Sequence, residues 1–137
     1  MRSRVPSLVL FTALAFGCGP NQLQVAGTWH ATMNNLPAVT IVVNDSGGKL
    51  IGNIIFYFQQ KDSGIWKVTR ENKEPLMNPT FDGHTLSFEL SHENAHPGES
   101  GPNDPPVKFE MILTGTDDAK LRSTNYGDNT ETPMKRK

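Results

Sequence analysis

Apolar and polar residues alternate in short runs along most of the chain after residue 24, the pattern of strands with one buried face. Two runs, 85–91 and 107–114, show this alternation most clearly. The residues predicted to face inward in these runs are Leu86, Phe88, Leu90, Val107, Phe109, Met111 and Leu113. Their outward neighbours, such as Ser87 and Glu110, are polar, which indicates that one face of each strand is solvated.

Turn signals separate eight such segments. The predicted strands cover residues 25–33, 38–44, 49–60, 65–71, 85–91, 107–114, 120–124 and 132–136. The stretch 72–79 contains two prolines and is expected to be irregular or an edge. No segment shows helical periodicity of useful length, and sequential hairpins favour a meander. The sequence therefore predicts an all-β domain, a small antiparallel up-and-down β-barrel of about eight strands, over residues 25–137.

The first 17 residues differ from everything that follows. Arg2 and Arg4 precede an apolar run from 5 to 16, and small residues come next, which is the order of a signal peptide for export. The run is shorter than the roughly 20 apolar residues that span a bilayer. We therefore predict a signal peptide over 1–17 and a tether over 18–24.

Two cleavage sites remain open at the end of this segment. The residues from Leu14 to Cys18 resemble a bacterial lipobox, which implies lipidation of Cys18. Ala15-Phe16-Gly17 also fits the small-x-small pattern of an ordinary signal peptidase. The lipoprotein interpretation is favoured because the chain's one cysteine stands where a lipid would attach. By resemblance to lipoproteins of Gram-negative bacteria, Gly19 after the cysteine implies the outer membrane facing the periplasm, with secretion as the alternative.

Composition narrows the candidate partners. The formal net charge is −1, so no general basic excess attracts nucleic acid. A hydrophobic content of 36% is typical of a folded globular domain. A single cysteine excludes an internal disulfide. The expected partners are a membrane through the lipid anchor and either a small apolar ligand or another envelope protein, with no cofactor.

The longest gap between predicted strands, 92–106, contains the one pattern with catalytic precedent. His92-Glu93-Asn94-Ala95-His96 matches H-E-x-x-H, in which two histidines on one helix face bind zinc. Pro97-Gly98 follows at once and would end such a helix. A metal-dependent hydrolase using His92 and His96 is therefore kept as an alternative function. A weaker metal or ligand contact and simple solvated histidines are the other interpretations.

Aromatic side chains offer a second candidate site. Tyr57 and Trp66 could line a ligand pocket, together with the histidines of the long loop. Aromatic residues at strand spacing are more often plain core.

Short motifs resemble those of the calycins, the group that includes lipocalins and avidins. Gly27-Thr28-Trp29 opens the first predicted strand, and the segment from Phe81 to Phe88 forms an F-D-G-x-T-L-x-F hairpin. The pattern is also similar to small exported bacterial β-barrel domains of unknown function.

The resemblance implies one specific contact. In calycins, a basic side chain from the last strand packs over the first-strand tryptophan and helps to close the sheet. Trp29 is the matching tryptophan here, with Arg136 as the best-placed partner and Arg122 as the second. A guanidinium over an indole ring is favourable when the two lie within about 6 Å. A frayed C-terminus is the alternative.

From these observations we expect an exported lipoprotein carrying a non-enzymatic β-barrel binding or interaction module. A metal-dependent hydrolase and a purely structural envelope protein are the alternatives.

Overall fold

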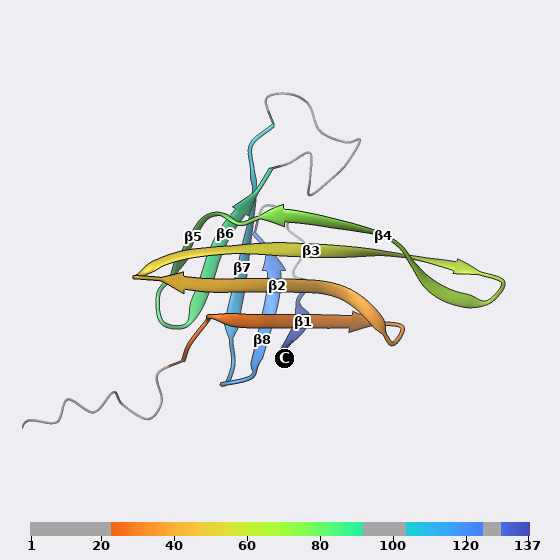
Figure 1. Cartoon of the computed structure of the whole chain (residues 1–137), viewed down its shortest axis with the longest axis horizontal. Helices are drawn as coiled ribbons and strands as arrows, with labels where there is room; N and C mark the ends of the chain where they lie inside the picture. The colour runs from red at the N-terminus through yellow and green to blue at the C-terminus, as the bar shows by residue number, and fades with distance from the viewer. Residues whose placement is uncertain (1–22, 92–103, 125–129) are drawn as a thin grey trace, which may run out of the picture.

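The computed structural model describes residues 23–91, 104–124 and 130–137, and none of these residues is helical. They form one antiparallel sheet of nine strands that curls strongly into a half-barrel (Figure 1). The strands are β1 (Gly27–Met33), β2 (Leu36–Ser46), β3 (Lys49–Asp62), β4 (Ile65–Pro75), β5 (Met77–Phe81), β6 (Thr85–Leu90), β7 (Val107–Leu113), β8 (Asp118–Ser123) and β9 (Thr132–Arg136). The prediction of an all-β antiparallel fold is confirmed.

Two meanders make up the sheet, in the order β4-β3-β2-β1-β9-β8-β7-β6-β5. The first and last strands, β1 and β9, join the meanders in the middle of the sheet. In Figure 1, β1 to β4 run across β6 to β8 at a steep angle, so that the two halves face each other. The two ends of the sheet, β4 and β5, follow each other directly in the chain and yet do not pair.

The hairpin turns follow from residues that tolerate positive φ. Asn34 and Asn35 adopt φ values of 54° and 60° between β1 and β2. Ser63 and Gly64 do the same between β3 and β4, at 50° and 83°. Two successive positive-φ residues make the tight turn whose twist matches that of paired strands.

The core lies between the two halves of the curled sheet. Trp29, Ile41 and Ile54 come from the first meander and are fully buried. Leu86, Phe88, Leu90, Met111 and Leu113 oppose them from β6 and β7. Phe109 is half-buried and stacks on Phe88, with ring centroids 5.6 Å apart. The inward-facing residues predicted for β6 and β7 therefore face inward.

Two features differ from the sequence prediction. The sheet has nine strands rather than about eight, because residues after Leu76 form the short strand β5. It is a half-barrel rather than a closed barrel, because β5 pairs on one side with β6 and has no strand partner on its other side among the described residues. The prolines and the positive φ of Asn78 (49°) in and around this segment account for its short, irregular pairing.

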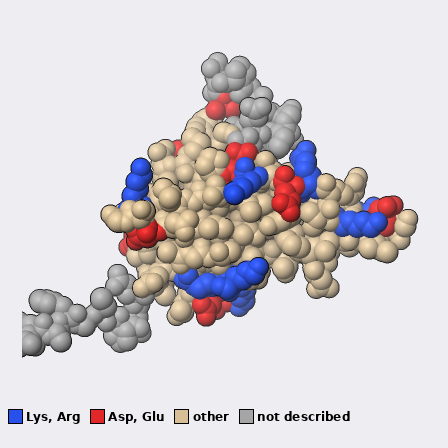
Figure 2. All heavy atoms as spheres, in the orientation of Figure 1, with Lys and Arg blue, Asp and Glu red and all other residues tan. Residues whose placement is uncertain are grey.

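Acidic and basic side chains mix on the surface. Figure 2 shows Lys or Arg atoms beside Asp or Glu atoms over the visible face. Ion pairs at the surface include Arg122 with Glu110 at 2.8 Å and Lys120 with Glu131 at 3.3 Å. Exposed pairs of this kind contribute little to stability. The surface therefore agrees with the near-neutral net charge of the whole chain.

Candidate functional site

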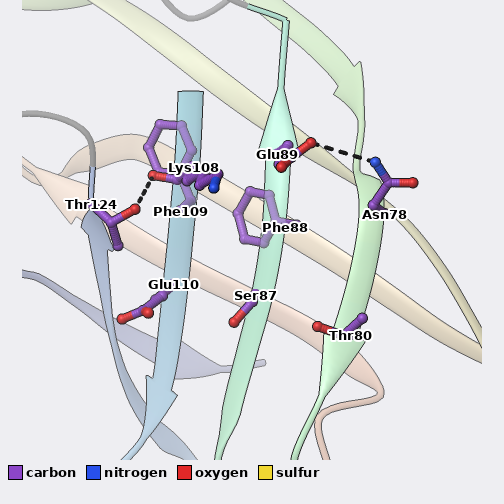
Figure 3. A pocket seen from close by; sticks show the side chains of 9 residues that line it. All are labelled: Asn78, Thr80, Ser87, Phe88, Glu89, Lys108, Phe109, Glu110 and Thr124. Carbon is purple, nitrogen blue, oxygen red and sulfur yellow. Dashed lines mark hydrogen bonds between the residues drawn. The ribbon is translucent and has the colours of Figure 1, made fainter. Parts of the chain in front are cut away.

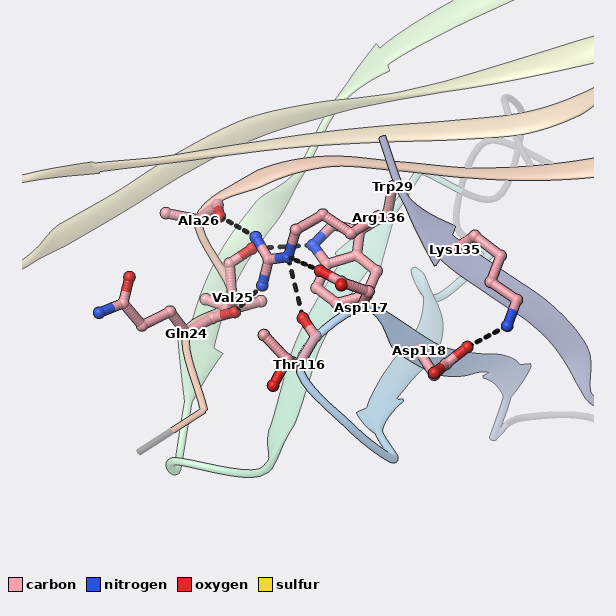
Figure 4. Close-up of polar contacts among 9 residues, drawn as sticks. All are labelled: Gln24, Val25, Ala26, Trp29, Thr116, Asp117, Asp118, Lys135 and Arg136. Atoms are coloured by element: carbon pink, nitrogen blue, oxygen red, sulfur yellow. Dashed lines mark hydrogen bonds and ion pairs between the residues drawn. The ribbon is translucent and has the colours of Figure 1, made fainter. Parts of the chain in front are cut away.

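The joint between β1 and β9 is built around Trp29, which is 0% exposed. The guanidinium carbon of Arg136 lies 4.3 Å from the centroid of the Trp29 ring (Figure 4). Trp29 and Arg136 are also register partners in the two strands. The indole Nε1 donates a hydrogen bond of 2.9 Å to the backbone oxygen of Val25. This is the arrangement that the calycin resemblance implies for Trp29 and Arg136.

Arg136 also binds the backbone of two distant segments. Its guanidinium donates to the carbonyl oxygens of Gln24 and Ala26, before β1. Its Nε donates to the carbonyl of Thr116 at 3.0 Å and lies 3.5 Å from a carboxylate oxygen of Asp117 (Figure 4). A planar guanidinium can make these contacts at once, because its donors point in several fixed directions. The joint is therefore a structural closure that ties β1, β9 and the β7–β8 turn together.

Arg122, the second candidate partner for Trp29, lies elsewhere. Its Nε and Nη2 donate to the same oxygen of Glu110, at 3.0 and 2.8 Å. Glu110 and Arg122 are register partners on β7 and β8. Arg122 therefore belongs to the outer face of the second meander.

The interior of the half-barrel is filled. Eleven large side chains among the described residues are less than 2% exposed, with Trp29 and Phe88 the largest. The cavities found in the described part of the chain are surface grooves and pockets lined in part by exposed residues.

The largest of these hollows is a groove of about 880 Å³ between the beginning of β3 and the strand β5, which we call the seam groove. Apolar residues that line it are Leu50, Ile51, Pro75, Leu76, Pro79 and Phe81. Polar residues at its margins are Asp45, Lys49, Asn78 and Thr80. Ile51 is 49% exposed, an unusually open position for a large apolar side chain.

Among the described residues, strand edges without a pairing strand border the seam groove on both sides. Residues 49–52 of β3 pair with β2, whereas the pairing of β3 with β4 begins only at Asn53. The backbone N–H of Leu76 donates to the carbonyl of Gly52 at 2.9 Å, where β4 leaves the sheet. On the opposite side, β5 presents its unpaired edge. The groove thus combines apolar side chains with backbone groups that an extended chain could bind.

A smaller and more polar hollow of about 290 Å³ lies on β5 to β8 (Figure 3). Ser87, Glu89 and Glu110 line it from β6 and β7. Glu89 accepts a hydrogen bond of 3.4 Å from Asn78, and Glu110 holds Arg122. Both carboxylates are therefore engaged by neighbours in the sheet.

Tyr57 and Trp66 do not share a pocket. The hydroxyl of Tyr57 lies 3.3 Å from that of Thr40, and both line a hollow of about 260 Å³ with His30. Trp66 pairs with Lys61 near the tip of the β3–β4 hairpin and is 40% exposed. Tyr57 and Lys61 are four residues apart on β3, roughly 13 Å along a strand. The two aromatic residues therefore lie at separate positions along the β3–β4 hairpin.

His30 adds a polar group that the sequence did not single out. Its Nδ1 is enclosed and has no hydrogen-bond partner among the described residues. The ring stands beside Thr40 across the β1–β2 pair.

Three predicted site residues lie outside the described residues, namely Cys18, His92 and His96. Within residues 23–91, 104–124 and 130–137, no three His, Cys, Asp or Glu side chains gather as a metal site would require. The same ranges contain no helix long and apolar enough to cross a membrane.

The seam groove was the site that sequence reasoning missed. Two signals pointed toward it: an apolar Ile51 on the outward side of β3, and the proline-containing stretch 72–79. Neither signal shows that the two segments face each other, because that depends on how the sheet curls.

Comparison of the chain with protein-family models, with curated proteins and with solved structures gives no match.

Proposed function

We propose that the chain is an exported lipoprotein, lipidated at Cys18, whose half-barrel is a non-enzymatic binding module of the bacterial envelope. The observation that carries the binding role is the seam groove, the largest hollow of the described fold. Its location outside a filled core favours a partner that binds on the surface. The outer membrane, facing the periplasm, is the proposed location.

The partner that fits the seam groove best is an extended segment of another envelope protein. A hydrocarbon ligand could cover Leu50, Ile51 and Phe81, but it would leave the backbone groups of both edges without partners. A polypeptide in extended conformation can add backbone hydrogen bonds at a sheet edge and place alternate side chains against the apolar lining.

The proposed kinship with the calycins rests on the Trp29–Arg136 joint and the meander order. Lipocalins and avidins hold ligands inside a closed barrel. In this chain the corresponding interior is occupied by side chains, so the proposed binding site lies at the opening instead.

Photo-crosslinking in the envelope of a Gram-negative host related to the source tests the binding role. A photoreactive residue replaces Ile51, in the groove, and separately Met33, which is 54% exposed at the β1–β2 turn. We expect a discrete protein adduct from position 51 and none from position 33. Equal adducts at both positions, or none, contradict the proposal, and a lipid adduct at 51 favours a small apolar ligand.

Lipidation is tested separately with a labelled fatty acid. The wild-type chain should incorporate the label and partition into detergent, whereas Cys18→Ser should do neither. A soluble, cleaved and unlabelled wild-type protein would show that an ordinary signal peptidase acts, without affecting the binding experiment.

A further inference from the structure

The β3–β4 hairpin extends well beyond the rest of the sheet (Figure 1). Strand β2 accompanies β3 only as far as the pair Val39–Phe56, so residues 57–71 pair only with each other. We call residues 57–71 the finger. Its base is braced where the Gln59 amide donates to the carbonyl oxygens of Met33 and Pro37, both at 2.9 Å.

Large apolar side chains are exposed at the free end of the finger. Ile65 is 61% exposed and Trp66 is 40% exposed, directly after the tight turn at Ser63-Gly64. The other exposed large apolar residues in the described ranges, Met33, Ile51 and Met77, lie outside the finger. The pair Ile65 and Trp66 marks a contact surface rather than scattered exposure.

Two cationic side chains of the finger lie over aromatic rings. Lys61 Nζ lies 5.8 Å from the centroid of the Trp66 ring, and the guanidinium carbon of Arg70 lies 4.2 Å from that of Phe58. The finger contains three cations and two carboxylates, in a chain whose net charge is −1. One of the carboxylates, Asp62, lies 3.8 Å from Lys67 Nζ, so a cation partly neutralises it. Figure 2 shows these charges of both signs at the projecting end.

We propose that the finger docks onto an anionic lipid surface. Tryptophan and lysine share the interfacial zone of a bilayer, where the indole lies at the headgroup level and the ammonium reaches the phosphates. Ile65, directly after the turn at the tip, enters the boundary of the acyl chains. The tip is short and its backbone is paired, so it stays in the interface and leaves the hydrocarbon core untouched.

This contact does not depend on the lipid at Cys18. The described chain begins at Leu23 near the start of β1, at the end of the domain opposite to the finger (Figure 1). The finger would therefore bind a lipid surface in an unlipidated protein as well. The test uses that protein, so that it gives a result whether or not Cys18 is lipidated.

The experiment measures vesicle binding of the chain from residue 18 onward with Cys18→Ser, which contains every described residue. The vesicles consist of phosphatidylcholine alone or of phosphatidylcholine with phosphatidylglycerol. The two tryptophans give a built-in reporter, because Trp29 is 0% exposed and Trp66 is 40% exposed. We expect the protein to sediment with the anionic vesicles and the emission to shift to shorter wavelength. Added salt should weaken the binding, because it screens the cations.

Variants assign the binding to the finger. Ile65→Ser with Trp66→Ser should abolish sedimentation, whereas Met77→Ser, at an exposed apolar position that belongs to neither the finger nor the lining of the seam groove, should leave it unchanged. Trp66→Phe should remove the emission shift and keep the binding. Lys61→Gln should weaken binding about fivefold, the contribution of one cation near an anionic surface.

Either of two results would overturn the proposal. In one, the protein does not sediment with the anionic vesicles and its tryptophan emission does not shift. This result is expected if the finger docks on a protein instead. In the other, the double serine variant binds vesicles as well as the wild type, which would place the lipid contact elsewhere. Unchanged urea midpoints for all finger variants would show that loss of binding is not loss of folding.

Discussion

The curled sheet has two sides at which its halves meet, and they are built in opposite ways. On the closed side, β1 and β9 pair and Arg136 binds Trp29 and the backbone before β1. On the open side, β3 and β5 face each other across the seam groove, with the backbone bond from Leu76 to Gly52 at its edge. The closed side joins segments more than 100 residues apart, whereas only β4 separates the two strands of the open side in the chain.

This difference shows that closeness in the chain does not decide which strand edges pair. The side chains and the backbone conformation of each edge decide it. Strand β9 offers Arg136 at the register position of Trp29. Strand β5 contains Pro79, which has no N–H to donate, and Asn78, whose φ of 49° bends the edge. These features accompany the absence of pairing between β5 and β4, its neighbour in the chain.

The largest expected effect concerns the tryptophan of the closed side. Trp29→Ala should lower the free energy of unfolding by about 3–5 kcal/mol, because it empties a fully buried site and removes the partner of Arg136. Trp66→Ala makes the same chemical change on the finger and should cost less than about 1 kcal/mol. Urea denaturation followed by circular dichroism measures both. Similar losses for the two variants would contradict the contrast between joint and finger.

Arg136→Lys tests whether the closed side needs the shape of the guanidinium or only its charge. A lysine cannot reach the carbonyls of Gln24, Ala26 and Thr116 together, so unfolding should become easier by about 1.5–3 kcal/mol. Lys135→Met, next to it in β9 and mostly exposed, is the control and should cost about 0–1 kcal/mol. If Arg136→Lys is as mild as the control, the joint is held by apolar packing alone.

Gly52→Ala tests how tightly the backbone of β3 is packed where it borders the seam groove. A Cβ at position 52 would lie 2.2 Å from the backbone oxygen of Val42, so β3 would have to shift, at a cost of about 1–3 kcal/mol. At Gly115 the nearest atoms would be 3.7–3.9 Å away, and Gly115→Ala should change stability by about 0.5 kcal/mol or less. Thermal denaturation of the two variants compares them. Equal melting temperatures for the two variants would mean that β3 shifts at position 52 without loss of stability.

Much of this fold follows from local sequence rules. Strand β9 has the predicted bounds, and the alternation in β6 and β7 gives the correct inward faces, because each strand's pattern is set by a period of two. The Trp29–Arg136 contact could be anticipated only through the calycin resemblance, since no local rule pairs residues 107 positions apart. The seam groove could not be predicted, because it arises from the curl of the whole sheet.

Strand β5 and the finger show the same limit. The two prolines of 72–79 indicated an edge, but the strand itself depends on pairing with β6. The strand predicted at 49–60 gave no sign that its last residues extend past the end of the pairing with β2. The number of paired residues depends on where the neighbouring strand turns. From the sequence, Trp66 is a candidate to line a ligand pocket or a part of the core, and the position that the fold gives it, 40% exposed near a hairpin tip, depends on the length of the hairpin.

The smallest predicted effect lies in the β5–β6 turn, beside the wall of the seam groove. Asp82 Oδ1 accepts hydrogen bonds from the backbone N–H of Thr85 at 2.7 Å and of His84 at 2.9 Å. These donors, first Thr85 and then His84, lower the pKa of Asp82 below its ordinary value of 3.8. Because the pKa is lower in the folded chain, the carboxylate stabilises the fold above the unfolded pKa, and this contribution is lost as the pH falls through the folded pKa.

Asp82→Asn removes the charge and keeps an acceptor oxygen. The variant should melt slightly below the wild type at neutral pH, and the difference should shrink as the pH falls below about 4, where the unfolded carboxyl becomes protonated. Melting temperatures of both proteins across acidic and neutral pH test this expectation. A difference that stays constant over the whole range would mean that the charge of Asp82 has no part in holding the hairpin. The wall of the seam groove formed by Phe81 would then owe its position to packing against the core rather than to this turn.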